Sequence, residues 1–165
     1  MQGTSPISVE EYDRMTFEHD AEYVLGRIVY RPEPEFPHAR LQATLGSYLC
    51  NHEGEWGLIG VCEQRVRIAA GVFRIPDLCL LRDAPDSGVV TRPPVVAIEI
   101  LSPDESAKEL SDKIVEYLDF GVEAVWVMDP IKRDGTIYPR EGRPRRVEDG
   151  MFRHGPVEVN IRELG

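Results

Sequence analysis

Two acidic residues lie in segments of the chain that are otherwise apolar. Asp77 follows Pro76 and precedes the apolar run 78–81, and Glu99 interrupts the apolar run 95–101. A protein retains a buried carboxylate only where that group is paired or coordinates a metal. Two such groups on neighbouring strands can share one Mg²⁺, which prefers oxygen ligands and keeps several waters. The pattern therefore indicates a divalent-metal site, whose ion would polarise a phosphodiester and activate a water.

An alternative assigns each acid a structural role. Either carboxylate could pair with an arginine such as Arg74, or cap a loop. For one acid alone the two interpretations are of similar weight. Two acids in two separate apolar segments favour the metal site.

A lysine-bearing helix follows Glu99 in the sequence. At about 100° per residue, Lys113 falls on the inner side of the helix and Lys108 on the opposite side, facing water. An inward lysine beside two carboxylates can stabilise the transition state of phosphoryl hydrolysis or orient the attacking water. The alternative is a surface lysine paired with Glu109, four residues earlier. The inner side is defined by the apolar stripe of Leu110, Ile114, Tyr117 and Leu118.

The surrounding pattern predicts the elements that would position these residues. Capping boxes at 8–11 and 106–109 each begin a helix, the second ending at Gly121. The segment 95–128 reads as strand, helix and strand, which is typical of a parallel βαβ unit. The other expected elements are a strand at 23–30 turning at Gly26, a proline-rich loop at 31–37, a helix at about 38–51, two strands at 63–68 and 73–81, and short hairpin strands in the tail.

Length and composition favour one α/β domain over residues 1–165. The sequence has no apolar run of the roughly 20 residues that span a bilayer, and no signal-peptide pattern at its start. With 29 acidic and 19 basic residues the net charge is −10, which disfavours tight, non-specific DNA binding by a monomer. Three cysteines without metal-ligand spacing are expected to be buried free thiols in a reducing cytoplasm: Cys50, Cys62 and Cys79.

The sequence resembles the Uma-two family of restriction-endonuclease-like domains, a branch of the PD-(D/E)xK nuclease superfamily. The resemblance covers most of the chain to about residue 130. It rests on a proline–aspartate pair, Glu-x-Leu-Ser-Pro, a helical lysine before Tyr117, Gly-Val, and a tryptophan strand ending in Asp-Pro. It implies a restriction-endonuclease-like mixed central sheet flanked by helices, with N-terminal and C-terminal hairpins. The segments that carry it are AEYVLGRIVY, IPDLCLL and VVAIEILSPDESAKELSDKIVEYLDFGVEAVWVMDP.

The resemblance also implies roles for particular residues. Asp77 and Glu99 match the two metal-binding acids of the superfamily motif. Glu22 matches an acid that completes the metal site or activates water, and His38 matches a recurring histidine at a helix start. The sequence departs from the motif two residues after the second acid, where Leu101 replaces the expected lysine. The resemblance implies that the lysine has moved to the helix, where Lys113 fits the wheel.

These observations together predict a Mg²⁺-dependent endonuclease that hydrolyses DNA, with Mn²⁺ as a substitute ion. The backbone carbonyl of Ile100 would add a metal ligand, and a homodimer could cut both strands of a duplex. Gln64 could face the cleft. An arginine cluster at 140–146 either contacts phosphates or forms a solvated loop. Two alternatives are a catalytically inactive nuclease-fold module for nucleic-acid or protein interaction, and a small-molecule metal hydrolase.

Overall fold

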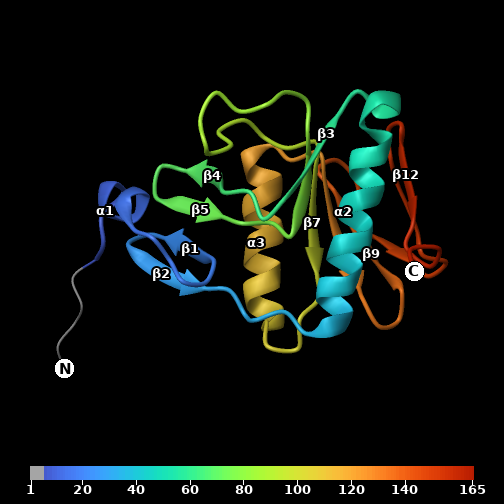
Figure 1. Cartoon of the computed structure of the whole chain (residues 1–165), viewed down its shortest axis with the longest axis horizontal. Helices are drawn as coiled ribbons and strands as arrows, with labels where there is room; N and C mark the ends of the chain where they lie inside the picture. Colours follow the sequence, from blue (N-terminus) through green and yellow to red (C-terminus); the bar gives the residue numbers. More distant parts are fainter. Residues whose placement is uncertain (1–5) are drawn as a thin grey trace.

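The computed structural model describes residues 6–165, and its centre is a six-stranded mixed sheet with a helix on each face (Figure 1). Among the described strands of this sheet only β7 and β8 are parallel neighbours, and the helix α3 (Ala107–Phe120) connects them, so the predicted βαβ unit is confirmed. In spatial order the strands of this central sheet are β10 (Arg145–Val147), β9 (Asp134–Pro139), β8 (Ala124–Asp129), β7 (Val96–Ile100), β6 (Leu78–Leu81) and β3 (Ile59–Cys62).

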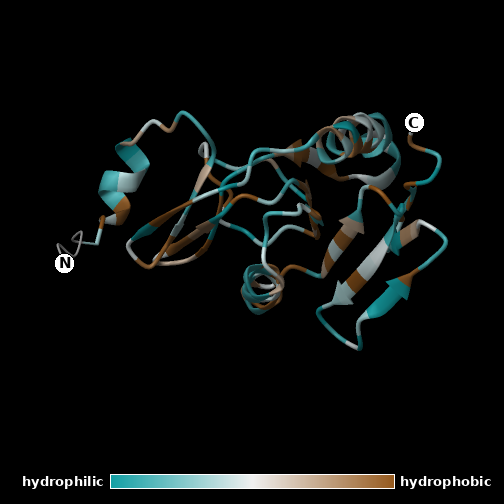
Figure 2. Ribbon diagram, turned by 90° about the horizontal axis from the view of Figure 1, so that it is seen from below, coloured by the Kyte–Doolittle hydropathy of each residue, from teal (hydrophilic) through white to brown (hydrophobic). Residues whose placement is uncertain are grey.

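Alternate residues of the central strands face two different helices. Ile98 packs into a core with Leu45 of α2 (Phe36–Trp56), whereas Ala97 packs into a second core with Tyr117 of α3. Figure 2 shows both helices almost end-on, with the strands of the sheet between them. Because successive side chains of a strand point to opposite faces, the side on which a residue of β7 lies follows from whether its number is odd or even.

A second, four-stranded sheet carries the N-terminal part of the chain. The hairpin β1–β2 turns at Leu25 and Gly26, which both have positive φ, as a type I′ turn requires. The helix α1 (Val9–Arg14) covers this sheet through Tyr12, which packs on Tyr23. In order the strands are β2 (Arg27–Tyr30), β1 (Ala21–Val24), β5 (Val72–Arg74) and β4 (Val66–Ala69).

The remaining hairpin closes the α2 side of the central sheet. It consists of β11 (Met151–His154) and β12 (Val157–Asn160), and its Phe152 packs on Trp126 of β8. The predicted C-terminal hairpin is therefore confirmed, and Trp126 is a core residue.

The prediction of two strands between residues 58 and 81 is wrong, because four strands form there. The predicted strand 73–81 divides at Ile75 and Pro76, and proline has no backbone N–H with which to continue a ladder. Asp77 therefore lies just before β6 and not within a strand.

The predicted helix 38–51 is longer than expected at both ends. Pro37 is accommodated in the first turn of α2, where the missing N–H is not needed. Gly57, with φ of 65°, ends the helix. The capping boxes that begin α1 and α3 are both confirmed.

The expectation of buried cysteines holds for one residue of three. Cys79 is buried on the α3 side of the sheet, but Cys50 and Cys62 are exposed. All three are free thiols.

Candidate active site

The pairing of β6 with β7 brings the two predicted metal-binding acids together. Leu78 is opposite Ile98 in this antiparallel pair, so Asp77 and Glu99 occupy the next opposed positions. Both lie on the face of the sheet that α3 covers, because Ile98 and Leu78 pack on the α2 side. Asp77 is 1% exposed and Glu99 is 2% exposed. The sequence prediction that these carboxylates are buried neighbours is confirmed.

Asp77 is held by three donors. Its Oδ2 accepts a hydrogen bond from the backbone N–H of Ile100 (2.7 Å) and lies 3.3 Å from Nε2 of His38. Its Oδ1 pairs with the guanidinium of Arg31. Burial by itself raises the pKa of Asp77, but the His38 hydrogen bond and the Arg31 charge outweigh burial, so this pKa lies below its ordinary value. Asp77 is therefore ionised at neutral pH.

Glu99 is less well compensated than Asp77. Its Oε1 accepts a hydrogen bond from the hydroxyl of Tyr117 (2.8 Å), and its Oε2 lies 3.8 Å from Nζ of Lys113. Burial raises the pKa of Glu99 to about 8, and the nearby charges of Asp77 and Glu22 add to that rise against the opposing effect of Lys113. A Glu99 that is protonated at neutral pH would lose this proton to solvent when a cation binds its carboxylate.

Lys113 projects inward from α3 as the helical wheel predicts. Its Nζ lies 2.7 Å from Glu105, 3.8 Å from Glu99 and 3.8 Å from Glu22. Burial by itself lowers the pKa of Lys113, but the surrounding carboxylates, Glu99 first, raise it, so the ammonium stays charged. The alternative pairing with Glu109 is wrong, because Glu109 closes the capping box with Ser106.

Lys108 is on the outer side of α3, as predicted. It is exposed and pairs with Asp112 at 2.6 Å. The two lysines of this helix therefore differ in surroundings, which makes Lys108 a matched control for Lys113.

Glu22 is a buried acid of β1 that adjoins the pair. Its Oε2 accepts from Arg74 (2.8 Å), and its Oε1 accepts from the backbone N–H of Ile75 (3.0 Å) while lying 3.8 Å from Lys113. Arg74 is itself held by Glu116 through two hydrogen bonds. Arg74 therefore pairs with Glu22 and with neither Asp77 nor Glu99. The alternative that an arginine neutralises one of these acids nevertheless holds for Asp77, which pairs with Arg31.

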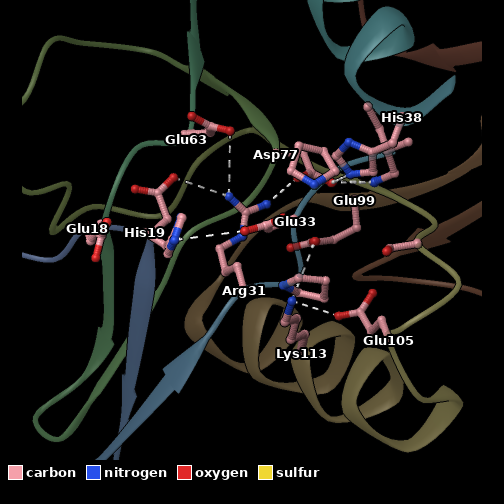
Figure 3. A pocket seen from close by; sticks show the side chains of 15 residues that line it. Glu18, His19, Arg31, Glu33, His38, Glu63, Asp77, Glu99, Glu105 and Lys113 are labelled. Carbon is pink, nitrogen blue, oxygen red and sulfur yellow. Dashed lines mark hydrogen bonds and ion pairs between the residues drawn. The ribbon is translucent and has the colours of Figure 1, made fainter. Parts of the chain in front are cut away.

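The two acids and Lys113 border a pocket of about 290 Å³, and Glu22 lies outside its lining (Figure 3). Asp77, Glu99, Lys113 and His38 all line it, as does Ile100, the expected source of a carbonyl ligand. Seven carboxylates and two cationic side chains, Arg31 and Lys113, surround the space. The full lining is Glu18, His19, Asp20, Arg31, Pro32, Glu33, Pro34, His38, Glu63, Asp77, Glu99, Ile100, Ser102, Glu105 and Lys113.

The donor set fits a Mg²⁺-type ion. One or two carboxylates with several waters are the usual protein contribution to such a site, and Asp77 and Glu99 supply two at one pocket wall. Burial, and after it the charges of Asp77 and Glu22, raise the pKa of Glu99, and a divalent cation at the carboxylate would oppose this rise. No group of three or more His, Cys, Asp or Glu side chains gathers into a metal-holding cluster within residues 6–165.

Gln64 does not face the pocket, contrary to the sequence prediction. It precedes β4, and its side-chain nitrogen donates to the backbone carbonyl of Gly88 at 2.8 Å. The neighbouring Glu63 lines the pocket instead. A one-residue shift along an extended segment reverses the direction of the side chain, which explains the error.

The arginine cluster at 140–146 also lies outside the pocket lining. Arg145 and Arg146 begin β10, and Arg146 pairs with Asp134 at 2.6 Å. The cluster is largely exposed.

Two residues of the pocket lining and one buried residue behind it were not recognised in the sequence as parts of the site. Arg31 opens the proline-rich loop, and Glu105 lies in the loop before α3, where charged residues are common. Tyr117 was correctly placed in the core, but its hydroxyl also holds Glu99. Its position on the apolar stripe at helical spacing from Lys113 was the only available indication.

Comparison with known proteins identifies the family. Residues 9–159 match the family Uma2, described as "Putative restriction endonuclease". The chain belongs to this family. The Uma2 match spans the acids, the lysine helix and the terminal hairpins alike, and so extends beyond the residues that carried the resemblance in sequence.

A solved structure has the same fold as this Uma2 chain. It is a crystal structure from Anabaena variabilis, described as a "putative nuclease belonging to DUF820". The TM-score is 0.83 at 20% sequence identity, and the match covers 96% of this chain and 97% of that one. The predicted restriction-endonuclease-like α/β fold is thereby confirmed. No curated protein sequence matches the chain. None of the helices within residues 6–165 has the length and apolar character needed to cross a membrane.

Proposed function

We propose that this Uma2 chain is a Mg²⁺-dependent endonuclease that hydrolyses phosphodiester bonds of DNA, with Mn²⁺ able to replace Mg²⁺. The observation that carries the proposal is the opposition of Asp77 and Glu99 at one buried pocket wall, with the ammonium of Lys113 3.8 Å from Glu99. A functional site explains why a protein keeps three buried ionisable groups together. The family description supports a nuclease, and the metal and the DNA substrate are our extension of it.

Each residue has a distinct task in this proposal. Asp77 and Glu99 would hold the metal together with the backbone carbonyl of Ile100. A bound divalent ion supplies Lewis-acid polarisation of the phosphodiester and lowers the pKa of an attacking water. Lys113 would stabilise the negative charge that develops on the phosphoryl oxygens, because its ammonium is fixed in a largely water-excluded site.

Glu22 and His38 act through these groups. Glu22 lies 3.8 Å from the ammonium of Lys113, and Arg74 holds Glu22 in place through an ion pair. All three side chains are buried, so Glu22 can keep the ammonium in position away from solvent. His38 contacts the Asp77 oxygen that also accepts from Ile100, and so orients the carboxylate. We propose that both are positioning residues. We further propose a homodimer, in which two sites related by a two-fold axis would cut both strands.

A plasmid-nicking assay tests the catalytic proposal. Supercoiled plasmid is incubated with Mg²⁺ or Mn²⁺ and either the wild-type protein or Asp77→Ala, and nicked product is quantified over time. Activity of the wild type and its loss in Asp77→Ala are expected. The matched control is Asp83→Ala, which removes an exposed aspartate beyond the opposite end of β6.

Equal activity of Asp77→Ala and the wild type would remove the catalytic assignment. Metal binding without nicking by the wild type would instead favour a nuclease-fold module that binds nucleic acid or protein. The acidic net charge of −10 is the observation that favours this second candidate. Metal-dependent turnover of small phosphoesters alone would favour the small-molecule hydrolase.

A further inference from the structure

Arg31 occupies the one oxygen of Asp77 that the rest of the described structure leaves for a metal. Oδ2 is engaged by Ile100 and His38, whereas Oδ1 pairs with Arg31 (Figure 3). The guanidinium is largely buried, with 14% of its side chain exposed. A divalent cation that binds Oδ1 would therefore lie beside a fixed positive charge, and like charges at such separations repel strongly away from bulk water.

A second binding position for the Arg31 guanidinium, between Asp20 and Glu63, lies beside the position at Asp77. Its NH1 is 3.7 Å from Asp20 and 3.9 Å from Glu63, too far for direct hydrogen bonds but within ion-pair range. Both acids are about half exposed, so neither is committed to a buried partner. The backbone of Arg31 is fixed by the hydrogen bond from its N–H to the carbonyl of Asp20 (3.0 Å). A side-chain rotation alone would move the charge from Asp77 to these acids.

The negative charge of the pocket indicates what the released guanidinium would bind. Seven carboxylates line the space, and one divalent ion would neutralise only two of those charges. An incoming phosphodiester is itself anionic, and Lys113 is held within the carboxylate cluster by Glu105. Arg31 is the other cationic side chain of the lining, and a guanidinium can bind two phosphate oxygens at once.

We propose that Arg31 is an exchangeable counter-ion that leaves Asp77 when a divalent cation binds, turns to Asp20 and Glu63, and there binds a phosphate of the substrate. The inference rests on the proposed function, since it assumes that Asp77 holds the metal. It assigns Arg31 two effects of opposite sign. The residue weakens metal binding and strengthens nucleic-acid binding.

Isothermal titration of the metal-free protein with Mn²⁺ tests the first effect. Arg31→Gln should bind Mn²⁺ at least about fivefold more tightly than the wild type, because a competing cation is removed. Arg31→Lys, which keeps the charge, should stay within about twofold of the wild type. The control Arg27→Gln changes an exposed arginine of β2, the strand that precedes Arg31, and should not change the affinity. Unchanged or weaker Mn²⁺ binding by Arg31→Gln would overturn the proposal.

The opposite effect is measured with a phosphorothioate-linked oligonucleotide, which resists cleavage, at saturating Mn²⁺. Arg31→Gln should bind this probe about tenfold more weakly, as expected for the loss of a phosphate-binding guanidinium. Affinity equal to that of the wild type would overturn the substrate role of Arg31.

A pair of double variants tests the second position of the guanidinium. Asp20→Asn with Glu63→Gln removes both receiving acids and should weaken Mn²⁺ binding. Glu18→Gln with Glu33→Gln removes the same number of charges from the same pocket and serves as the control. Equal effects of the two double variants would overturn the exchange.

One further variant separates this inference from the proposed function. If Asp77→Asn leaves Mn²⁺ binding intact, the metal assignment fails and the Arg31 proposal fails with it. If Asp77→Asn abolishes binding while Arg31→Gln changes nothing, only the Arg31 proposal fails.

Discussion

The two faces of the central sheet differ in kind. On the α2 face, the even-numbered residues of β7 pack against leucines of α2 in a core without charge: Leu41, Leu45 and Leu49. On the α3 face, the same strand presents Ala97 and then Glu99, and the helix opposite supplies both apolar side chains and Lys113. One strand thus serves a stabilising core on one side and a charged pocket on the other.

The difference shows that burial has opposite free-energy effects on apolar and on charged side chains in this molecule. A buried leucine contributes stability through the apolar area that it removes from water. A buried carboxylate costs free energy unless it is compensated, and Glu99 is compensated incompletely, as its raised pKa records. Substitutions on the α2 face should therefore affect stability and spare the site. Substitutions of Glu99 and Lys113 on the α3 face should mainly affect the site, whereas the apolar residues of that face also form a core.

The largest effect on stability is expected from Leu45→Ala on the α2 face. Leu45 is fully buried, so its truncation leaves a cavity and should lower the free energy of unfolding by about 2–5 kcal/mol. Denaturant unfolding measures this loss, with the exposed Ser47→Ala of the same helix as control. Mn²⁺ affinity of the folded protein should not change. A weakened metal affinity would show that the two faces are coupled.

Lys113→Met on the α3 face should raise the activation free energy of DNA nicking by an amount similar to the stability lost in Leu45→Ala. The change keeps an unbranched side chain one atom shorter and removes its charge, so DNA nicking should fall by about 10²–10³-fold. Mn²⁺ affinity should hold or rise, because a neighbouring cation has gone. Lys108→Met on the solvent side of α3 should leave nicking unchanged. Equal nicking by Lys113→Met and Lys108→Met would exclude a catalytic role for Lys113.

Glu99→Gln should stabilise the protein at alkaline pH while it weakens metal binding. The pKa of Glu99 is raised to about 8 from 4.5, so the folded state keeps a proton that the unfolded state loses between these values. Stability of the wild type is therefore lost as pH rises through that window. Glutamine does not titrate, so the variant should gain about 1–3 kcal/mol relative to the wild type by pH 8.5.

Unfolding at pH 5 and pH 8.5 measures this gain, which should be small at the lower pH. A difference between the two proteins that does not grow with pH would contradict the assigned protonation of Glu99.

The smallest effect is expected from Glu116→Gln, at the edge of the charged face. Glu116 holds Arg74 through two hydrogen bonds, but Arg74 keeps its buried partner Glu22. Thermal unfolding should report a loss of about 0.5–1 kcal/mol, and nicking should change by less than about threefold. A large loss of nicking would show that Glu22 depends on Glu116 for its position.

The sequence predicted the members of the pair better than it predicted their surroundings. Asp77 and Glu99 were recognisable because a carboxylate in an apolar run is rare, and Lys113 because α3 has a regular apolar stripe. The alternation of β7 side chains between the two faces of the sheet follows from the two-residue repeat of a β-strand alone. These features depend on local sequence, which is why they could be inferred.

The partners of the pair depend on contacts between distant segments. Arg31 is 46 residues from Asp77, and Arg74 is 52 residues from Glu22. Nothing in the sequence indicates which arginine neutralises which acid, so Arg74 was the plausible partner and Arg31 is the actual one for Asp77. The strand count between 58 and 81 was missed because each of these strands is only three or four residues long.

Diffraction from crystals soaked in Mn²⁺ tests the central claim most directly. The anomalous difference map should contain one strong peak bridging the carboxylates of Asp77 and Glu99, with Lys113 within about 3–4 Å of a metal-bound water, which is close to hydrogen-bond reach. The side chain of Arg31 should have left Asp77 for Asp20 and Glu63. Saturating Mn²⁺ that gives no peak at this pair, or a peak elsewhere in the pocket, would contradict the account.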